Sequence, residues 1–264
     1  MNPPSSISAD QPPRFFKVRV EKNTLVVTFP GPRNVMSWAI LNGGVRTRAS
    51  HIINHHVDPR TSDSDPRKTL RQAASRIGIQ GTFVGMLTGA DVRRFSMACA
   101  AYNELQAYVI STAGCGNLST VGETGNYVEG DSPPMPAGTI NIIVALNYGF
   151  THEAMLEAMA IVTEAKVRAV YELGLKSVAT GGSATGTGTD CLAVAVGHNR
   201  RYVFCGKHTK WGELVGKASL ESIRGALRLA TAGNNRDGEL KSARDAPDGG
   251  SLERGQVRAS RRRS

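Results

Sequence analysis

The sequence predicts an α+β fold, with one main domain in which helices cover a mixed, largely antiparallel sheet. Short runs of β-branched and aromatic residues separated by turn residues indicate strands. Two longer stretches place apolar residues at helical spacing, and hairpins and helices alternate without a regular βαβ order. The alternative is a layered α/β sandwich. With 264 residues, 40% of them hydrophobic, the chain can fill one sizeable core.

The N-terminal half is expected to begin with a hairpin. Phe15 to Val20 and Thr24 to Phe29 are its strands, and a further strand covers Val35 to Leu41. A short helix follows, because Asp65 precedes a proline and Gly78 follows a stretch of apolar residues at helical spacing.

Further strands and the clearest helices are expected after residue 80. The predicted strands are Thr82 to Thr88, a hairpin of Phe95 to Tyr102 with Glu104 to Ser111 turning at Asn103, the buried Thr139 to Leu146, and a pair made of Cys191 to Val196 with Tyr202 to Cys205. Thr151 can cap a long helix that Gly174 can end. A last helix is expected from about Trp211 to Ala230.

The chain divides into a flexible N-terminus (residues 1–14), a folded domain (15–232) and a disordered basic tail (233–264). Pro and Ser dominate the start, and the tail, rich in Gly, Asp and Arg, can bury little apolar surface. The net charge is +10, and from Asn234 to Ser264 eight Arg or Lys oppose five Asp or Glu. No nucleic-acid-binding motif accompanies this charge, so no nucleic-acid partner is expected. Oligomeric state is left open.

Composition favours a soluble, cytoplasmic protein without disulfides. The longest apolar stretches, such as Ile140 to Leu146, are far shorter than the roughly 20 residues that span a bilayer, so no membrane partner is expected. Met1 to Pro13 does not resemble a secretory leader. The four cysteines form no CxxC pair, which argues against a zinc ribbon or a redox dithiol.

Two glycine-rich segments are the main candidates for a site. In Thr180 to Asp190, glycines alternate with small hydroxyl residues, so backbone N–H groups can approach a polar ligand; the simpler interpretation is a flexible turn. The segment lacks the spacing of a Walker loop. Ser111 to Asn117 offers a similar open backbone, and amides there can stabilise a developing oxyanion. Cys115 is more simply a packing residue than a nucleophile.

Lys166 falls on the apolar face of the long helix, with Val162 and Val170 four residues away on either side. Its ammonium either snorkels to the helix edge or faces a cleft and pairs with a carboxylate such as Asp190. Glu164 projects from the opposite side of the helix and is more simply a solvated carboxylate.

The histidines are candidate metal ligands or catalytic residues. His51 and His55 lie four apart, but Ile52 stands where a zinc-protease motif carries glutamate, and His55 and His56 point apart on a strand. A metal site there is possible and not favoured. His208 precedes a helix, where it is either a general acid or base or an ordinary loop histidine.

Several motifs together resemble the adenosylcobinamide amidohydrolase family. They are Leu41-Asn42-Gly43-Gly44, Ile53-Asn54 with Val57, Val84 to Thr88, Thr112-Ala113-Gly114 with Asn117, Gly138-Thr139-Ile140-Asn141, Thr163 to Lys166, Thr185 to Asp190, and Gly206 to Thr209 with Gly212-Glu213. The resemblance covers residues 35 to 220, nearly the whole predicted domain.

The resemblance implies a corrinoid substrate and hydrolysis of the amide that joins aminopropanol to one propionate of the ring. Cobalt is carried by the substrate, so no protein-bound cofactor or metal is expected. Asp190, His208 and Lys166 are the candidate catalytic residues. The candidate substrate-binding residues are Asn54, Thr112, Gly114, Asn117, Asn141, Glu164, Gly186, Thr187, Gly188 and Thr189.

The mechanism and two rival functions stay open. Water attack with Asp190 or His208 as base is preferred, and a covalent route through Thr187 or Thr189 is the rival. A non-catalytic corrinoid-binding protein is the alternative function, and a nucleotide-dependent enzyme is a weaker one.

Overall fold

The computed structural model describes residues 13–58, 65–125, 138–199 and 201–244, and its fold is α+β. The helices are α1 (Pro66–Arg76), the short 3-10 helix η1 (Val92–Arg94), α2 (His152–Glu172) and α3 (Lys210–Arg244). The strands are β1 (Lys17–Glu21), β2 (Thr24–Ser37), β3 (Gly44–His56), β4 (Phe83–Thr88), β5 (Ser96–Tyr102), β6 (Leu105–Ala113), β7 (Leu118–Ser119), β8 (Ile140–Leu146), β9 (Gly149–Phe150), β10 (Gly186–Thr187), β11 (Cys191–Val196) and β12 (Arg201–Tyr202).

The main sheet has eight strands, in the order β4-β3-β2-β11-β8-β6-β5 with β1 paired to β2. The β3–β4 and β8–β11 pairs are parallel, and the other pairs in this sheet are antiparallel. The mixed, largely antiparallel sheet that the sequence predicts is therefore confirmed.

The sheet folds over on itself because β2 is irregular in its middle. The pairing of β2 with β3 shifts register between Thr28 and Val35, and such bulges bend a strand and increase its twist. One cluster of buried side chains joins Leu25 and Ile52 from one half of the sheet to Ile110 and Ile143 from the other. The fold thus brings β3 and β4 close to β6 and β8.

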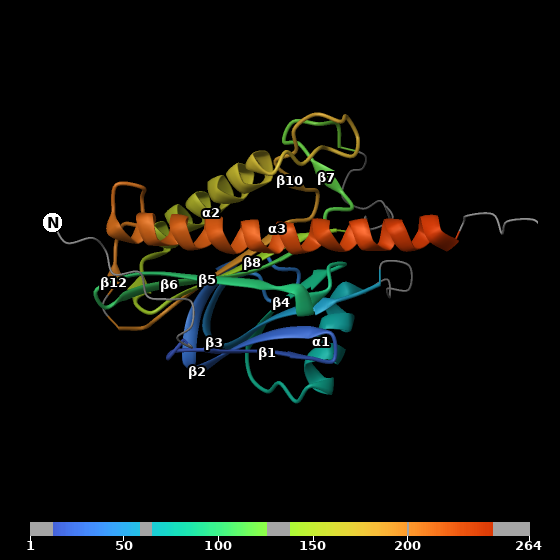
Figure 1. Ribbon diagram of the computed structural model, residues 1–264. Coiled ribbons are helices and arrows are strands. Elements are labelled where there is room, and N and C mark those ends of the chain that lie inside the picture. Colours follow the sequence, from blue (N-terminus) through green and yellow to red (C-terminus); the bar gives the residue numbers. More distant parts are fainter. Residues whose placement is uncertain (1–12, 59–64, 126–137, 200, 245–264) are drawn as a thin grey trace, which may run out of the picture. The chain divides into compact units, whose positions relative to one another are not determined.

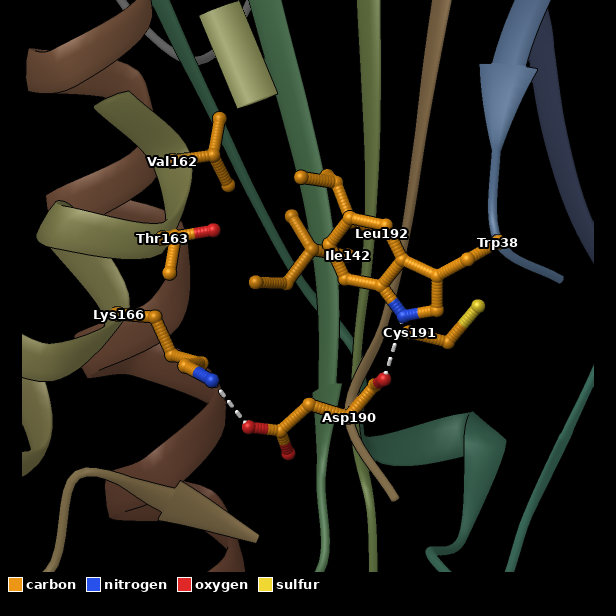
Figure 2. Close-up of a pocket in the computed structure, with 8 residues that line it drawn as sticks. All are labelled: Trp38, Ile142, Val162, Thr163, Lys166, Asp190, Cys191 and Leu192. Atoms are coloured by element: carbon orange, nitrogen blue, oxygen red, sulfur yellow. Dashed lines mark hydrogen bonds and ion pairs between the residues drawn. The ribbon is translucent and has the colours of Figure 1, made fainter. Parts of the chain in front are cut away.

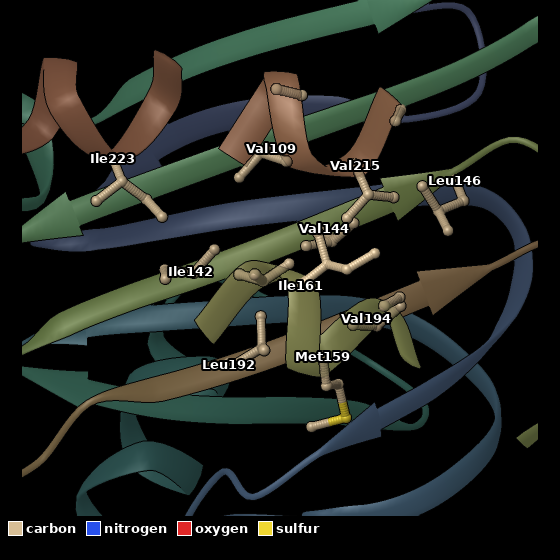
Figure 3. Close-up of a cluster of buried hydrophobic side chains, with 14 of the residues drawn as sticks. Val109, Ile142, Val144, Leu146, Met159, Ile161, Leu192, Val194, Val215 and Ile223 are labelled. Atoms are coloured by element: carbon tan, nitrogen blue, oxygen red, sulfur yellow. The ribbon is translucent and has the colours of Figure 1, made fainter. Parts of the chain in front are cut away.

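Helices cover the outer faces of this folded sheet (Figure 1). Helices α2 and α3 lie over the β6–β8–β11 part, and Figure 3 shows their side chains meeting residues such as Ile142, Val144 and Leu192 in the largest core cluster. Helix α1 packs through Leu70 and Ala74 on a smaller cluster that includes Ile53 of β3. None of the described helices is both long and apolar enough to cross a membrane.

Local sequence signals set several of these elements as predicted. Asp65 caps α1 by accepting hydrogen bonds from the N–H groups of Arg67 and Lys68, and Thr151 caps α2 by accepting one from Ala154. Asn103 has φ +50°, which suits the tight turn between β5 and β6. The turn after β1 likewise uses positive φ at Lys22 and Asn23.

Two strand predictions in the first half were wrong. The segments Thr24 to Phe29 and Val35 to Leu41 are not separate strands, because β2 runs from Thr24 to Ser37. Strand β3 was not predicted, since its first half is polar and largely exposed and lacks the apolar alternation of a strand. His51 and His55, which lie four residues apart, are both on β3 and not on a helix, where that spacing would place them on one face.

Two further predictions failed near the C-terminus. Tyr202 to Cys205 does not pair with β11; instead β12 pairs with β9 in parallel, and Val203 and Phe204 are exposed. Helix α3 ends at Arg244, beyond the end expected at Ala230. Within the tail, residues 245–264 lie outside the described residues, as do residues 1–12 at the start.

Candidate active site

The glycine-rich segments meet at one end of the folded sheet. Residues 114–117 follow the C-terminal end of β6, Gly138 and Thr139 precede β8, and residues 185–190 precede β11. Because β6 is antiparallel to β8 and β11 is parallel to it, these three ends coincide. The sheet topology therefore places both candidate segments together.

Lys166 and Asp190 form an ion pair at the centre of this region, which confirms the pairing considered from the helix pattern. The Lys166 Nζ donates to Asp190 Oδ2, and the two side chains are 15% and 10% exposed. Figure 2 shows Lys166 reaching from α2 toward Asp190 at the start of β11. Removing one partner of such a pair would leave an uncompensated charge in a poorly solvated place.

The Asp190 carboxylate is held by further donors. Its Oδ1 accepts a hydrogen bond from the Thr187 hydroxyl, and from the backbone N–H groups of Ile140 and Thr187 at 3.1 Å each. The Thr187 N–H also lies 3.1 Å from Oδ2. With Lys166, four donor groups from the described residues surround the carboxylate, which has about four lone-pair positions. We call Lys166, Thr187 and Asp190 the Asp190 cluster.

Gly186 is required by the close packing of this cluster. A Cβ at Gly186 would lie 2.3 Å from Asp190 Oδ2 and 2.7 Å from Lys166 Nζ. Gly188 differs, because a Cβ there would meet nothing within 4 Å and the residue is exposed. The loop therefore packs tightly on the ion pair at Gly186, and at Gly188 its backbone is open to a ligand.

Thr189 and Asn117 lie beside the Asp190 cluster. The Thr189 hydroxyl contacts Thr139 Oγ1 at 2.7 Å and donates to the Gly138 carbonyl at 3.0 Å, while Asn117 Nδ2 donates to Thr189 Oγ1 at 3.4 Å. Asn117 Oδ1 is buried and has no hydrogen-bond partner among the described residues. Gly114 allows the segment after β6 to lie close to Gly138, since a Cβ at position 114 would lie 3.0 Å from the Gly138 Cα.

Asn54, Thr112 and Asn141 form a buried polar network across the folded sheet. Asn54 Nδ2 donates to Thr112 Oγ1, and Asn141 Nδ2 donates to Asn54 Oδ1, each at 2.8 Å. Asn141 Nδ2 also donates to the Leu87 carbonyl at 2.8 Å. Each of the three residues is about 1% exposed. Their position supports a role in holding β3, β6 and β8 together beneath the loops rather than direct substrate contact.

A small pocket with an empty volume of about 190 Å³ lies beside the ion pair. Trp38, Thr163, Lys166, Asp190 and Cys191 line it together with apolar residues of α2, β8 and β11 (Figure 2). The Trp38 indole donates to the Asp190 carbonyl at 2.8 Å. Burial raises the pKa of Cys191 to about 12, so its thiol stays neutral and non-nucleophilic at physiological pH.

Glu164 and His208 are not brought to the Asp190 cluster. Glu164 is 60% exposed and pairs with Lys207 at 2.7 Å, on a different side of α2 from Lys166, as the helix pattern predicted. His208 is exposed and lies against Gly206, close to the position of Glu157. It follows β12, which pairs with β9 beyond the C-terminal end of β8, whereas Asp190 lies at the opposite end.

The His208→Gln variant is therefore expected to keep catalytic activity within about twofold of the wild-type rate, since an exposed side chain remote from the Asp190 cluster changes little. The measurement is the initial rate at saturating substrate. A loss of a hundredfold or more, in the range of a missing acid or base, would restore His208 to the catalytic set.

The other candidate ligands and nucleophiles are dispersed. His51, His55 and His56 contact three different groups: Ser50 Oγ, Thr24 Oγ1 and the Ala90 carbonyl. Among the residues that the structure describes, His, Cys, Asp and Glu form no group of three placed to hold a metal ion. Burial raises the pKa of the Cys115 thiol, which disfavours its reactive thiolate.

Sequence reasoning missed two contributors to the site. Trp38 was placed inside a strand, although it follows β2 and the residue is 51% exposed. The backbone N–H of Ile140 was not recognised as a donor to Asp190. A tryptophan directly after an apolar strand is a signal that could have drawn attention to Trp38; the Ile140 contact depends on sheet register alone.

Comparison with known proteins agrees with the resemblance found in the sequence. A family model described as adenosylcobinamide amidohydrolase matches residues 9–235. A Methanosarcina mazei protein of that name is 27% identical over 199 residues, covering 72% of this chain and 88% of that protein. An uncharacterised protein of Methanocaldococcus jannaschii is 31% identical over 224 residues, covering 78% of this chain and 86% of that protein.

Among solved structures, the PH0078 protein of Pyrococcus horikoshii is 11% identical, with coverage of 81% of this chain and 78% of that one. Its TM-score of 0.35 is too low to add to the description of the fold. The assignment rests on the sequence relatives and on the extent of the family match. The chain belongs to the adenosylcobinamide amidohydrolase family.

Proposed function

We propose that this protein hydrolyses the amide bond between the corrin-ring propionate and the aminopropanol of adenosylcobinamide. The products are adenosylcobyric acid and 1-amino-2-propanol, and the reaction serves the salvage of incomplete corrinoids for cobalamin synthesis. Family membership supports amidohydrolase activity, and the M. mazei relative carries the corresponding name. The observation that carries the proposal is the Asp190 cluster, where a hydroxyl, a carboxylate and a cation meet beside open glycine loops.

The cluster supplies what amide cleavage requires, namely a nucleophile, an acceptor for its proton and donors for the carbonyl oxygen. The Thr187 hydroxyl donates a hydrogen bond to Asp190, and Lys166 orients the Asp190 carboxylate. A nucleophile beside a base that a third group holds in place is typical of covalent catalysis. A water reaches Asp190 as a base only by displacing one of the four donors. The geometry thus favours Thr187 over direct attack by water.

The reaction then proceeds in two steps. Thr187 Oγ1 bonds to the amide carbon while its proton passes to Asp190, and that proton goes to the aminopropanol nitrogen as the C–N bond breaks. Water cleaves the resulting ester, which releases the carboxylic acid and restores the hydroxyl. Lys166 pairs with the carboxylate and positions it. We assign stabilisation of the oxyanion to Asn117 and the loop amides.

Thr187→Ala is expected to lower kcat at least a hundredfold, whereas Thr189→Ala retains most activity, because Thr189 contacts a hydroxyl, a carbonyl and an amide but no carboxylate. Added hydroxylamine should yield a hydroxamate of the corrinoid with wild type and Thr189→Ala, as detected by mass spectrometry. Thr187→Ala with near-normal turnover would exclude the ester and favour water attack on Asp190.

The proposal is tested by incubating purified protein with adenosylcobinamide without nucleotide, with and without a chelator, and quantifying released 1-amino-2-propanol. We expect equal release in both samples, because the cobalt belongs to the substrate and the reacting groups are side chains. Release only with added nucleotide would indicate the nucleotide-dependent enzyme, and release only without chelator would indicate a metal requirement. Tight binding of unchanged corrinoid would support the binding-protein alternative.

A further inference from the structure

We infer that the corrin ring of the substrate binds in a second, larger cleft beside Trp38, lined by Ile40, Asn42 and the side chains of Arg46, Arg67 and Arg71. This inference rests on the proposed function and assigns the part of the substrate that does not react. The cleft has an empty volume of about 860 Å³ and is open to solvent. The pocket beside Asp190 is much smaller, with an empty volume of about 190 Å³.

The two concave regions adjoin at Trp38, which lines both. Its indole N–H is tied to the Asp190 carbonyl at 2.8 Å, yet half of its side chain is exposed. Ile40 nearby is 38% exposed. A flat aromatic face held in a fixed position, with an apolar neighbour, suits stacking against a flat macrocycle. A ring bound there would lie next to the pocket that Asp190 lines, because Trp38 lines both.

The rim of the cleft offers unused hydrogen-bond donors. Arg67 and Arg46 each donate through Nε to a backbone carbonyl, those of Ile40 and Asn42, at 3.1 Å. Arg71 is exposed and has no hydrogen-bond or ion-pair partner among the described residues. A corrin ring carries a fringe of primary amides whose carbonyl oxygens accept hydrogen bonds. The remaining guanidinium N–H groups match these acceptors.

The cleft floor is built by a turn that also belongs to the motifs of the family resemblance. Asn42 has φ +58° and donates through Nδ2 to the Phe83 carbonyl at 2.8 Å. A Cβ at Gly43 would lie 2.3 Å from the Ala39 carbonyl oxygen, and Leu41 pairs with Gly85 of β4. The turn is thus fixed against the sheet. The Asn42-Gly43 motif has no role at the reacting groups, and shaping this cleft accounts for it.

The test measures binding of cobyric acid, which keeps the ring but lacks the scissile amide, by equilibrium dialysis with the corrinoid absorbance as signal. We expect Trp38→Ala to raise Kd at least about tenfold and Arg71→Gln to raise it about fivefold to tenfold. KM for adenosylcobinamide rises in parallel in Arg71→Gln, while kcat stays within about twofold. Trp38→Phe, which keeps an aromatic face, recovers part of the affinity.

Arg168→Gln is the matched control, since Arg168 is an exposed arginine on α2 that pairs with Glu172. It should leave Kd and KM unchanged, and circular dichroism checks that each variant is folded. Unchanged Kd in folded Trp38→Ala and Arg71→Gln would overturn the inference. Competition by millimolar inorganic phosphate, with a steep loss of affinity in salt, would also overturn it, because the cleft would then recognise an anion.

Failure of the proposed function gives a different result. A wild-type protein that binds cobyric acid through these residues but releases no aminopropanol would contradict catalysis and leave the ring-binding cleft standing. If the wild-type protein hydrolyses adenosylcobinamide and all these variants have the wild-type KM, the result would contradict the ring-binding cleft alone. Wild-type protein that neither binds nor hydrolyses a corrinoid would contradict both.

Discussion

Asp190→Asn is expected to lower kcat for adenosylcobinamide hydrolysis by about a hundredfold to ten-thousandfold, the range typical of losing a general base. The amide cannot take the proton of Thr187, and it leaves the nearly buried Lys166 without its counter-charge. Affinity for the corrinoid should change little, because the ring contacts lie in the cleft beyond Trp38. The rate at saturating substrate and the Kd for cobyric acid together measure the effect.

The control for this variant is Glu172→Gln, which removes a carboxylate that pairs with Arg168 and Arg224 on the helix surface. Solvent screens exposed ion pairs of this kind, so activity and stability should hardly change. Thermal unfolding of Asp190→Asn distinguishes lost chemistry from lost structure. Full activity in Asp190→Asn would remove Asp190 from the mechanism.

Gly186→Ala is expected to lower kcat about a hundredfold. The added methyl would lie 2.3 Å from Asp190 Oδ2 and 2.7 Å from Lys166 Nζ, so the ion pair must move to accommodate it. A displacement of about 1 Å at reacting groups commonly costs about a hundredfold in rate. Overpacking costs about 1 to 3 kcal/mol, so the free energy of unfolding should also fall.

Gly188→Ala supplies the matched comparison two residues along the same loop. A Cβ there meets nothing within 4 Å, so the variant should keep the wild-type unfolding transition and the Asp190 cluster intact. Both variants are compared by turnover rate and by chemical denaturation. Equal losses in the two variants would mean that general loop rigidity, rather than contact with the ion pair, explains the need for glycine.

Short sequence patterns predicted where two helices begin and offered a partner for Lys166. The capping residues Asp65 and Thr151 mark where α1 and α2 begin, because the cap satisfies N–H groups within the same turn. Of the two placements expected for Lys166, snorkelling to the helix edge or pairing with a carboxylate such as Asp190, the structure shows the pairing. These inferences depend on contacts that a short segment specifies, or on a charge with few acceptable partners.

Contacts set by the folded sheet could not be predicted in this way. The Asn54–Thr112 hydrogen bond spans 58 residues and forms because the bulged β2 folds one half of the sheet over the other. The first half of β3 is polar and lacks the apolar alternation that predicts a strand. Strand β12 pairs with β9 and not with β11, the apolar strand that precedes it in the sequence. The separation of His208 from Asp190 follows from that pairing. Trp38 gains its importance only from the position of the Asp190 carbonyl.

In the proposed reaction, the protein breaks one amide bond of adenosylcobinamide by adding water. The direct measurement is mass spectrometry of the corrinoid after incubation in water enriched in ¹⁸O. We predict adenosylcobyric acid carrying one ¹⁸O in its new carboxyl group, together with free 1-amino-2-propanol, and no such product with Asp190→Asn. Recovery of unchanged adenosylcobinamide from the wild-type protein would contradict the account.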